Sequence, residues 1–226
     1  QLDKVIGLGR IWRITHDSKE RDKTQPKMFE KTPGELIRYL EHPNGWWRDK
    51  AQQLIVLSRD QSTVPELKKV ALSNKNQFAR THAIWCLEGL GALQTDLLKT
   101  LFQDPNPKIR IQAIRASETL YKSGKKSLAA SYLKLLEDDN IDVALQTMLT
   151  VKFLEVPDYQ KALSKIVKTN QAKGIQTVGN QILTPVKQEN RWNQNEVLLT
   201  DVQQESLEKG KVIGVPGTEG GELTRE

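Results

Sequence analysis

Small and apolar residues recur along this chain at nearly constant intervals. The stretch from Trp47 to Ser58 reads WRDKAQQLIVLS, and its pattern returns four more times. The positions that align with Arg48 are Arg80, Arg110, Ala144 and Gln176, with steps of 32, 30, 34 and 32 residues. Three positions further on, every copy has a small residue: Ala51, Ala83, Ala113, Thr147 and Gly179. A period of this size with two helices per unit predicts an all-α fold, an α-solenoid of about five HEAT- or armadillo-like helical hairpins.

Turn and capping residues divide residues 32–185 into these five hairpins. Thr32-Pro33-Gly34-Glu35 predicts a capping box at the first helix. Gly91 suits a left-handed helix end, and Thr95 is predicted to cap the first helix of the third unit. The predicted helix pairs are 35–40 with 46–57, 64–72 with 77–90, 96–102 with 109–121, 127–137 with 142–154, and 159–169 with 174–183.

The two ends of the chain do not follow the repeat. Residues 4–14 alternate like a strand with one buried face, so residues 1–15 are interpreted as a short N-terminal strand whose sheet would precede Gln1. Residues 16–31 are charged and contain Pro26, which predicts a linker. Residues 186–226 read as a second linker and a disordered tail. We therefore expect this chain to be a piece of a longer protein.

Charge and hydropathy limit the classes of partner. The net charge is +6, with 27% charged residues, and no apolar run approaches the roughly 20 residues of a membrane helix. We expect a soluble protein with no membrane span. A basic solenoid could attract nucleic acid. However, lysines alternate with acidic residues along the solvent faces, which does not favour a nucleic-acid partner.

Few residues offer chemistry. Cys86 is the single cysteine and lies between apolar residues of a predicted packed helix, where a thiol is normally inert. The three histidines, His16, His42 and His82, have no metal-ligand spacing. Gly7 and Gly9 form a G-x-G without the rest of a dinucleotide loop. We expect no catalytic, cofactor-binding or metal-binding residue in this chain, and so no enzyme activity of its own.

Arginines near the start of the second helices have two interpretations. Arg48, Arg80, Arg110 and Arg115 could hold phosphates while Trp46, Trp47 and Trp85 stack on bases. Alternatively, the arginines pair with acidic residues of neighbouring turns and hold successive repeats in register. Asp49, Asp104 and Asp139 lie near these turns as partners. We favour the second interpretation.

Residues 36–60, LIRYLEHPNGWWRDKAQQLIVLSRD, resemble a segment of the planctomycete-type membrane-bound dehydrogenases, also described as PVC-type haem-binding proteins. The specific core of the resemblance is His42, Pro43, Asn44, Gly45, Trp46 and Trp47, followed by Arg48 and Asp49. Residues 9–14, 82–93 and 104–118 agree with the same family. Members combine a glucose/sorbosone-dehydrogenase-like β-propeller, HEAT-like repeats and a c-type cytochrome domain with a C-x-x-C-H haem motif.

The resemblance implies what the chain does and where. Residues 1–15 would be the last strand of the propeller, and residues 186–226 would lead toward the cytochrome domain. No cysteine or histidine follows residue 213, so haem c, like any quinone cofactor, would belong to neighbouring domains and not to this chain. A periplasmic or cell-envelope location follows from the same resemblance.

Three functions remain open. The first is a non-catalytic HEAT-repeat connector that joins the propeller to the cytochrome domain, with these domains as intramolecular partners. The second is a scaffold that binds another protein or a peptide on the face formed by the second helices. The third is a helical-repeat nucleic-acid binder similar to alkylpurine glycosylases.

Overall fold

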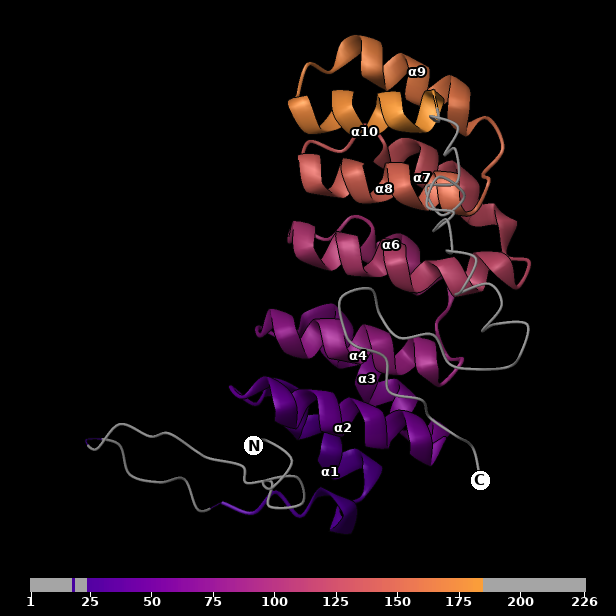
Figure 1. Cartoon of the computed structure of the whole chain (residues 1–226). Helices are drawn as coiled ribbons and strands as arrows, with labels where there is room; N and C mark the ends of the chain where they lie inside the picture. The colour runs from indigo at the N-terminus through magenta and orange to yellow at the C-terminus, as the bar shows by residue number, and fades with distance from the viewer. Residues whose placement is uncertain (1–17, 19–23, 185–226) are drawn as a thin grey trace, which may run out of the picture. The chain divides into compact units, whose positions relative to one another are not determined.

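The computed structural model describes Ser18 and residues 24–184, and these described residues form helices joined by short turns (Figure 1). The predicted N-terminal strand and the predicted C-terminal tail lie outside the described residues. In chain order the elements are η2 (Met28–Glu30), α1 (Pro33–Ile37), η3 (Arg38–Glu41), α2 (Gly45–Ser58), η4 (Gln61–Thr63), α3 (Val64–Ser73), α4 (Gln77–Gly89), α5 (Thr95–Leu101), α6 (Pro107–Lys122), η5 (Lys126–Leu128), α7 (Ala129–Leu135), α8 (Ile141–Phe153), α9 (Tyr159–Thr169) and α10 (Lys173–Leu183), where η marks a 3-10 helix.

Helices pack in the order of the chain. The chain divides into two units, residues 1–179 and residues 180–226, and the second includes the end of α10. Within the first unit, α1 packs on α2, α3 on α4, α5 on α6 and α7 on α8. The second helix of each pair also packs on the next: α2 on α4, α4 on α6 and α6 on α8, as Figure 1 shows. The prediction of an all-helical fold is confirmed for the described residues.

The repeat places one small residue at the same position of each second helix, and we call these five residues the small-residue column. Ala51, Ala83, Ala113, Thr147 and Gly179 are all buried. Gly179 shows how little room there is, because a Cβ placed on it would lie 2.3 Å from Cγ2 of Val167. Interiors packed at this density do not accept larger side chains without movement of the neighbouring helix.

Two of the predicted caps are confirmed and one is wrong. The capping box is present, because the Thr32 hydroxyl accepts from the Glu35 amide at 3.3 Å and the Glu35 carboxylate accepts from the Thr32 amide at 2.9 Å. Gly91 has a φ of +66°, the left-handed conformation that glycine tolerates best. Thr95 is not a cap: it is the first residue of α5, and extended Gln94 precedes it without a side-chain cap.

The first hairpin differs from its predicted form. The predicted helix over 35–40 is divided into α1 and the 3-10 helix η3, which ends just before His42. His42 is extended with ψ of 138°, as expected of a residue that precedes proline. At the end of the predicted linker, η2 packs on α2 and buries Met28 while Phe29 stays exposed.

The small-residue column predicts a sharp difference between two positions of α6. Replacement of buried Ala113 by leucine forces α6 away from its neighbours, and we expect the free energy of unfolding to fall by about 1–3 kcal/mol. Thr119→Leu, at an exposed position of the same helix, should change it by less than about 0.5 kcal/mol. Urea unfolding followed by circular dichroism measures both. Equal stability of the two variants would contradict close helix contact at Ala113.

Candidate functional site

The turns that lead into the second helices are built alike. In α2, α4, α6 and α8 an asparagine caps the helix by accepting the amide of the second residue after it, at 3.0 Å for Asn44, 2.9 Å for Asn76, 2.9 Å for Asn106 and 3.1 Å for Asn140. The asparagine's own amide donates to the side chain two residues earlier, which is His42 at 3.1 Å, Asn74 at 2.7 Å, Asp104 at 2.9 Å and Asp138 at 2.9 Å. We call these four segments the cap turns. They satisfy amides that the start of a helix would otherwise leave without a partner.

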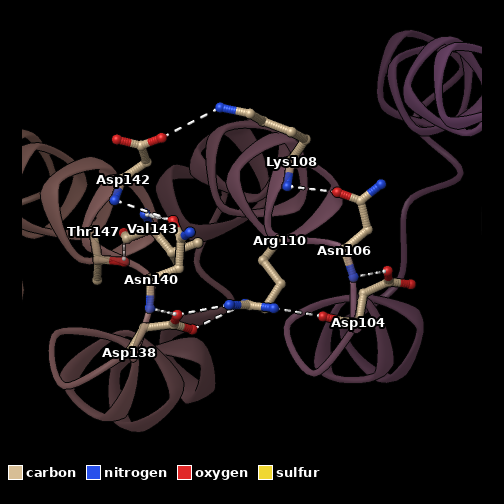
Figure 2. Close-up of polar contacts among 9 residues, drawn as sticks. All are labelled: Asp104, Asn106, Lys108, Arg110, Asp138, Asn140, Asp142, Val143 and Thr147. Carbon is tan, nitrogen blue, oxygen red and sulfur yellow. Dashed lines mark hydrogen bonds and ion pairs between the residues drawn. The ribbon is translucent and has the colours of Figure 1, made fainter.

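Arginines join consecutive cap turns in the middle of the unit. Arg110 donates from Nη1 to the Asp104 carbonyl oxygen of its own cap turn, at 2.7 Å. It also donates from Nε and Nη2 to the two carboxylate oxygens of Asp138 in the next cap turn, at 2.9 and 2.7 Å (Figure 2). Arg80 makes the same bidentate contact one unit earlier, with both carboxylate oxygens of Asp104, but its Nε donates at 2.8 Å to the Ala71 carbonyl of α3 and not to its own cap turn.

These two bidentate pairs are removed from solvent. Relative exposure is 11% and 9% for the side chains of Arg80 and Asp104, and 14% and 11% for those of Arg110 and Asp138. In such surroundings a guanidinium needs a carboxylate in fork geometry, because an unpaired buried charge is very costly. Figure 2 shows an outer pair for comparison, Lys108 with Asp142 at 3.3 Å, which is mostly exposed and contributes little.

The predicted acidic partners are only partly the observed ones. Asp104 pairs with an arginine, but the partner of Arg110 is Asp138 and not Asp139, because the fork reaches the residue that also anchors the cap turn. Asp49 is no partner of Arg48; its carboxylate lies 4.0 Å from His82. Arg48 instead donates to the His42 and Pro43 carbonyls at 2.6 and 2.9 Å.

The junction between α2 and α4 therefore has a different set of contacts. Nδ1 of His82 lies 2.7 Å from Oε1 of Gln52, and Nε of Arg48 donates to Nε2 of His82 at 3.4 Å. Burial lowers the pKa of His82, and Arg48 adds to the effect while Asp49 opposes it. The neutral ring fits this site because it accepts from Arg48, which a protonated ring could not do.

The residues that carry the family resemblance form an aromatic cluster at this end. His42 stacks on Trp47 with ring centroids 4.5 Å apart, and Tyr39 lies 5.5 Å from the same indole. Trp47 is buried, whereas Trp46, at an edge contact 6.4 Å from Trp47, is 51% exposed. Asn44 caps α2, and Pro43 and Gly45 complete the turn around it. The segment thus has structural roles throughout except at Trp46.

Exposed apolar side chains gather on the second helices. Most of the large hydrophobic residues that are exposed within the described part of the chain lie on α2, α4 and α8: Trp46, Leu57, Phe78, Ile141, Leu149 and Phe153. The others are Phe29 on η2 and Leu72 on α3. Exposed apolar side chains mark an interaction site only where they form a contiguous patch, so their position on the helices decides whether they matter.

Reactive groups are sparse in the part of the chain that the structure describes. Burial raises the pKa of the Cys86 thiol to about 12. A surface groove of about 450 Å³ beside Arg110 is lined by charges of both signs, including Lys99, Lys134 and Asp139. Within residues 24–184, no group of three His, Cys, Asp or Glu side chains is placed to hold a metal ion. Across the same residues, no helix combines the length and apolarity needed to cross a membrane.

Sequence reasoning placed turns at these asparagines but missed their role as helix caps, and it did not choose Asp138 as the partner of Arg110. Asn44, Asn76, Asn106 and Asn140 follow one another at 32, 30 and 34 residues, the spacing of the arginine register, so the pattern was visible in the sequence. The sequence could not show that Arg110 pairs with Asp138 and not with Asp139. The pairing depends on which of the two adjacent carboxylates accepts the Asn140 amide.

Comparison with known proteins adds no assignment: no protein-family model matches this chain, and no curated protein matches it in sequence. The resemblance to membrane-bound dehydrogenases therefore stays a prediction.

The buried pair predicts a large effect of removing one partner. Asp104→Ala leaves Arg80 buried without a carboxylate and removes the acceptor of the Asn106 amide, so we expect a loss of about 3–5 kcal/mol in the free energy of unfolding. Asp142→Ala, which breaks the exposed pair with Lys108, should cost less than about 1 kcal/mol. Urea unfolding of both variants is the measurement. A loss at Asp104 as small as that at Asp142 would contradict a buried bridge.

His82 predicts a loss of stability in acid. Burial lowers the pKa of His82 in the folded chain, so below the ordinary histidine pKa of about 6.5 the unfolded chain binds the proton more readily. The stabilisation is complete above that value and is lost as the pH falls through the folded-state pKa. We expect His82→Gln to lose less stability than the natural chain between pH 7.5 and pH 5, measured by urea unfolding at each pH. Parallel curves for the two proteins would show that His82 does not titrate in this way.

Proposed function

We propose that this chain is a non-catalytic α-solenoid scaffold. The observation that carries the proposal is the repeated junction: cap turn, buried arginine fork and small residue recur at consecutive second helices. A fork that binds two neighbouring cap turns resists sliding of one hairpin over the next, and close contact at the small residues resists bending. Helical hairpins stacked in this way act as a stiff spacer or a binding platform.

As a spacer, the scaffold would connect domains. The resemblance of residues 36–60 to membrane-bound dehydrogenases suggests a propeller before the chain and a c-type cytochrome domain after it, with the scaffold setting the distance between them. Under this proposal the haem and any quinone belong to the neighbouring domains, and the location is the periplasm or cell envelope.

As a binding platform, the scaffold would use the face of the second helices. The exposed apolar residues of α2, α4 and α8 favour this second function. Phosphate binding is less favoured, since Arg80 and Arg110 already engage carboxylates that neutralise their charge.

Stiffness can be measured with two spin labels. Gln53→Cys on α2 and Leu149→Cys on α8 replace exposed residues at equivalent positions, nine residues after Asn44 and Asn140. Cys86 should stay unlabelled because it is buried and its pKa is raised to about 12, and the natural chain is the control for this. We expect double electron-electron resonance to give one narrow distance distribution.

The same label pair in an Asp104→Asn background should give a broader distribution, because the fork to Arg80 is weakened. A broad distribution in the parent protein would contradict a stiff spacer. A narrow distribution that Asp104→Asn leaves unchanged would show that the arginine fork is not the source of stiffness.

A further inference from the structure

Three aromatic rings on the second helices are each covered by a cation from a neighbouring second helix. The Arg48 guanidinium lies 4.7 Å from the Phe78 ring centroid, the Arg115 guanidinium 5.9 Å from that of Trp85, and Lys122 Nζ 3.6 Å from that of Phe153. These contacts run from α2 to α4, from α6 to α4 and from α6 to α8. Arg48 belongs to the cap turn, where its guanidinium already donates to the His42 and Pro43 carbonyls. We call the other five residues, together with Trp46, the cationic aromatic surface.

Helix geometry places the members of this surface on one side of the second helices. Counted from the capping asparagine, Trp46 and Phe78 occupy position 2, Trp85 and Arg115 position 9, Phe153 position 13 and Lys122 position 16. The differences of seven, four and three residues are those of one face of an α-helix. α2, α4, α6 and α8 lie side by side in Figure 1, and the cation–ring contacts join neighbouring helices on this side.

Three of the four rings remain open to solvent, while Trp85 is half-buried and donates to Gln112 at 2.9 Å. Trp46 and Phe78 are each 51% exposed and Phe153 is 58% exposed, although aromatic side chains gain most when they are fully buried. Aromatic residues and arginine are the types enriched in protein interfaces. The surface therefore has the composition of a binding site.

The cations indicate the charge of the partner. Arg115 and Lys122 have no ion pair with a carboxylate among the described residues, so both cations are available to a carboxylate of a partner. Among the carboxylates of the same helices, Asp142 pairs with Lys108 and Glu118 accepts a hydrogen bond from the Thr150 hydroxyl. A cation held over a ring presents an apolar plane and a positive charge together.

We propose that the cationic aromatic surface docks an acidic peptide segment of a partner protein, with apolar side chains of the peptide against the rings and its carboxylates on Arg115 and Lys122. The proposal rests on the scaffold function and specifies its partner. Attraction between the charges would speed association and weaken as salt screens it.

Selection from a random library of 12-residue peptides displayed on phage, with the full chain as target, tests the proposal. We expect enrichment of peptides that combine Asp or Glu with Leu, Phe or Trp. Enrichment of basic or uncharged peptides, or no enrichment at all, would overturn the proposal.

The most enriched peptide then serves as a fluorescent probe in anisotropy titrations. We expect binding to weaken about tenfold or more in Trp46→Ala/Phe78→Ala and severalfold in Arg115→Gln, and to weaken with added salt. Leu72→Ala removes an exposed apolar residue of α3, away from the surface, and should bind like the natural chain. Equal binding by all variants, or displacement of the probe by duplex DNA, would overturn the proposal.

A failure of this test is distinguishable from a failure of the scaffold function. The substituted residues are exposed, so thermal unfolding should stay close to that of the natural chain in every variant. If the spin-label distance distribution is narrow but no acidic peptides are enriched, the proposal of a stiff spacer is kept and only the proposal of a docking surface is rejected.

Discussion

Burial of a guanidinium beside the start of a helix is the constraint on which the middle of this structure depends. Arg80 and Arg110 project into the junction between two hairpins, where water has little access. Each needs a carboxylate in fork geometry, and the carboxylate must come from the following cap turn. The same carboxylates, on Asp104 and Asp138, accept the amide of the capping asparagine. One residue thus fixes the turn, the start of the helix and the register of two hairpins.

The other junctions show what happens without this pair. Between α2 and α4 the position of the aspartate is held by Asn74, and Arg48 turns back to backbone carbonyls of its own turn. At this junction a hydrogen bond between His82 and Gln52 replaces the ion pair. The contacts of His82 depend on whether its imidazole is protonated. In α10 the arginine position is Gln176, which still donates to the carbonyl six residues earlier, at 2.6 Å. We infer that the two junctions with buried arginine–aspartate pairs resist movement between hairpins most strongly, and that the outer junctions open more easily.

The periodic part of this architecture was predictable from sequence. Residue spacing located the second helices and the small-residue column, and local chemistry located the Thr32 capping box and the turn at Gly91. The prediction that Thr95 caps α5 was wrong. A hydroxyl residue caps a helix only when its own backbone is extended, and here the extended residue before the helix is Gln94. The partner of Arg110 could not be chosen between Asp138 and Asp139, because side-chain direction in a turn depends on packing. The cations over Phe78, Trp85 and Phe153 were equally hidden, since each contact joins residues of different units.

The two faces of the second helices have separate tasks in this account. The cap turns hold the hairpins together with polar contacts that are already satisfied, while the exposed side keeps aromatic rings and cations available. Hydrogen exchange of the Asn106 and Asn140 backbone amides tests the central claim most directly, because these amides donate to the carboxylates that the arginines hold. The account predicts that both amides exchange as slowly as the middle of α6. Exchange at the rate of an open loop would show that the cap turns are not fixed, and the arginine forks would then not be what holds the hairpins in register.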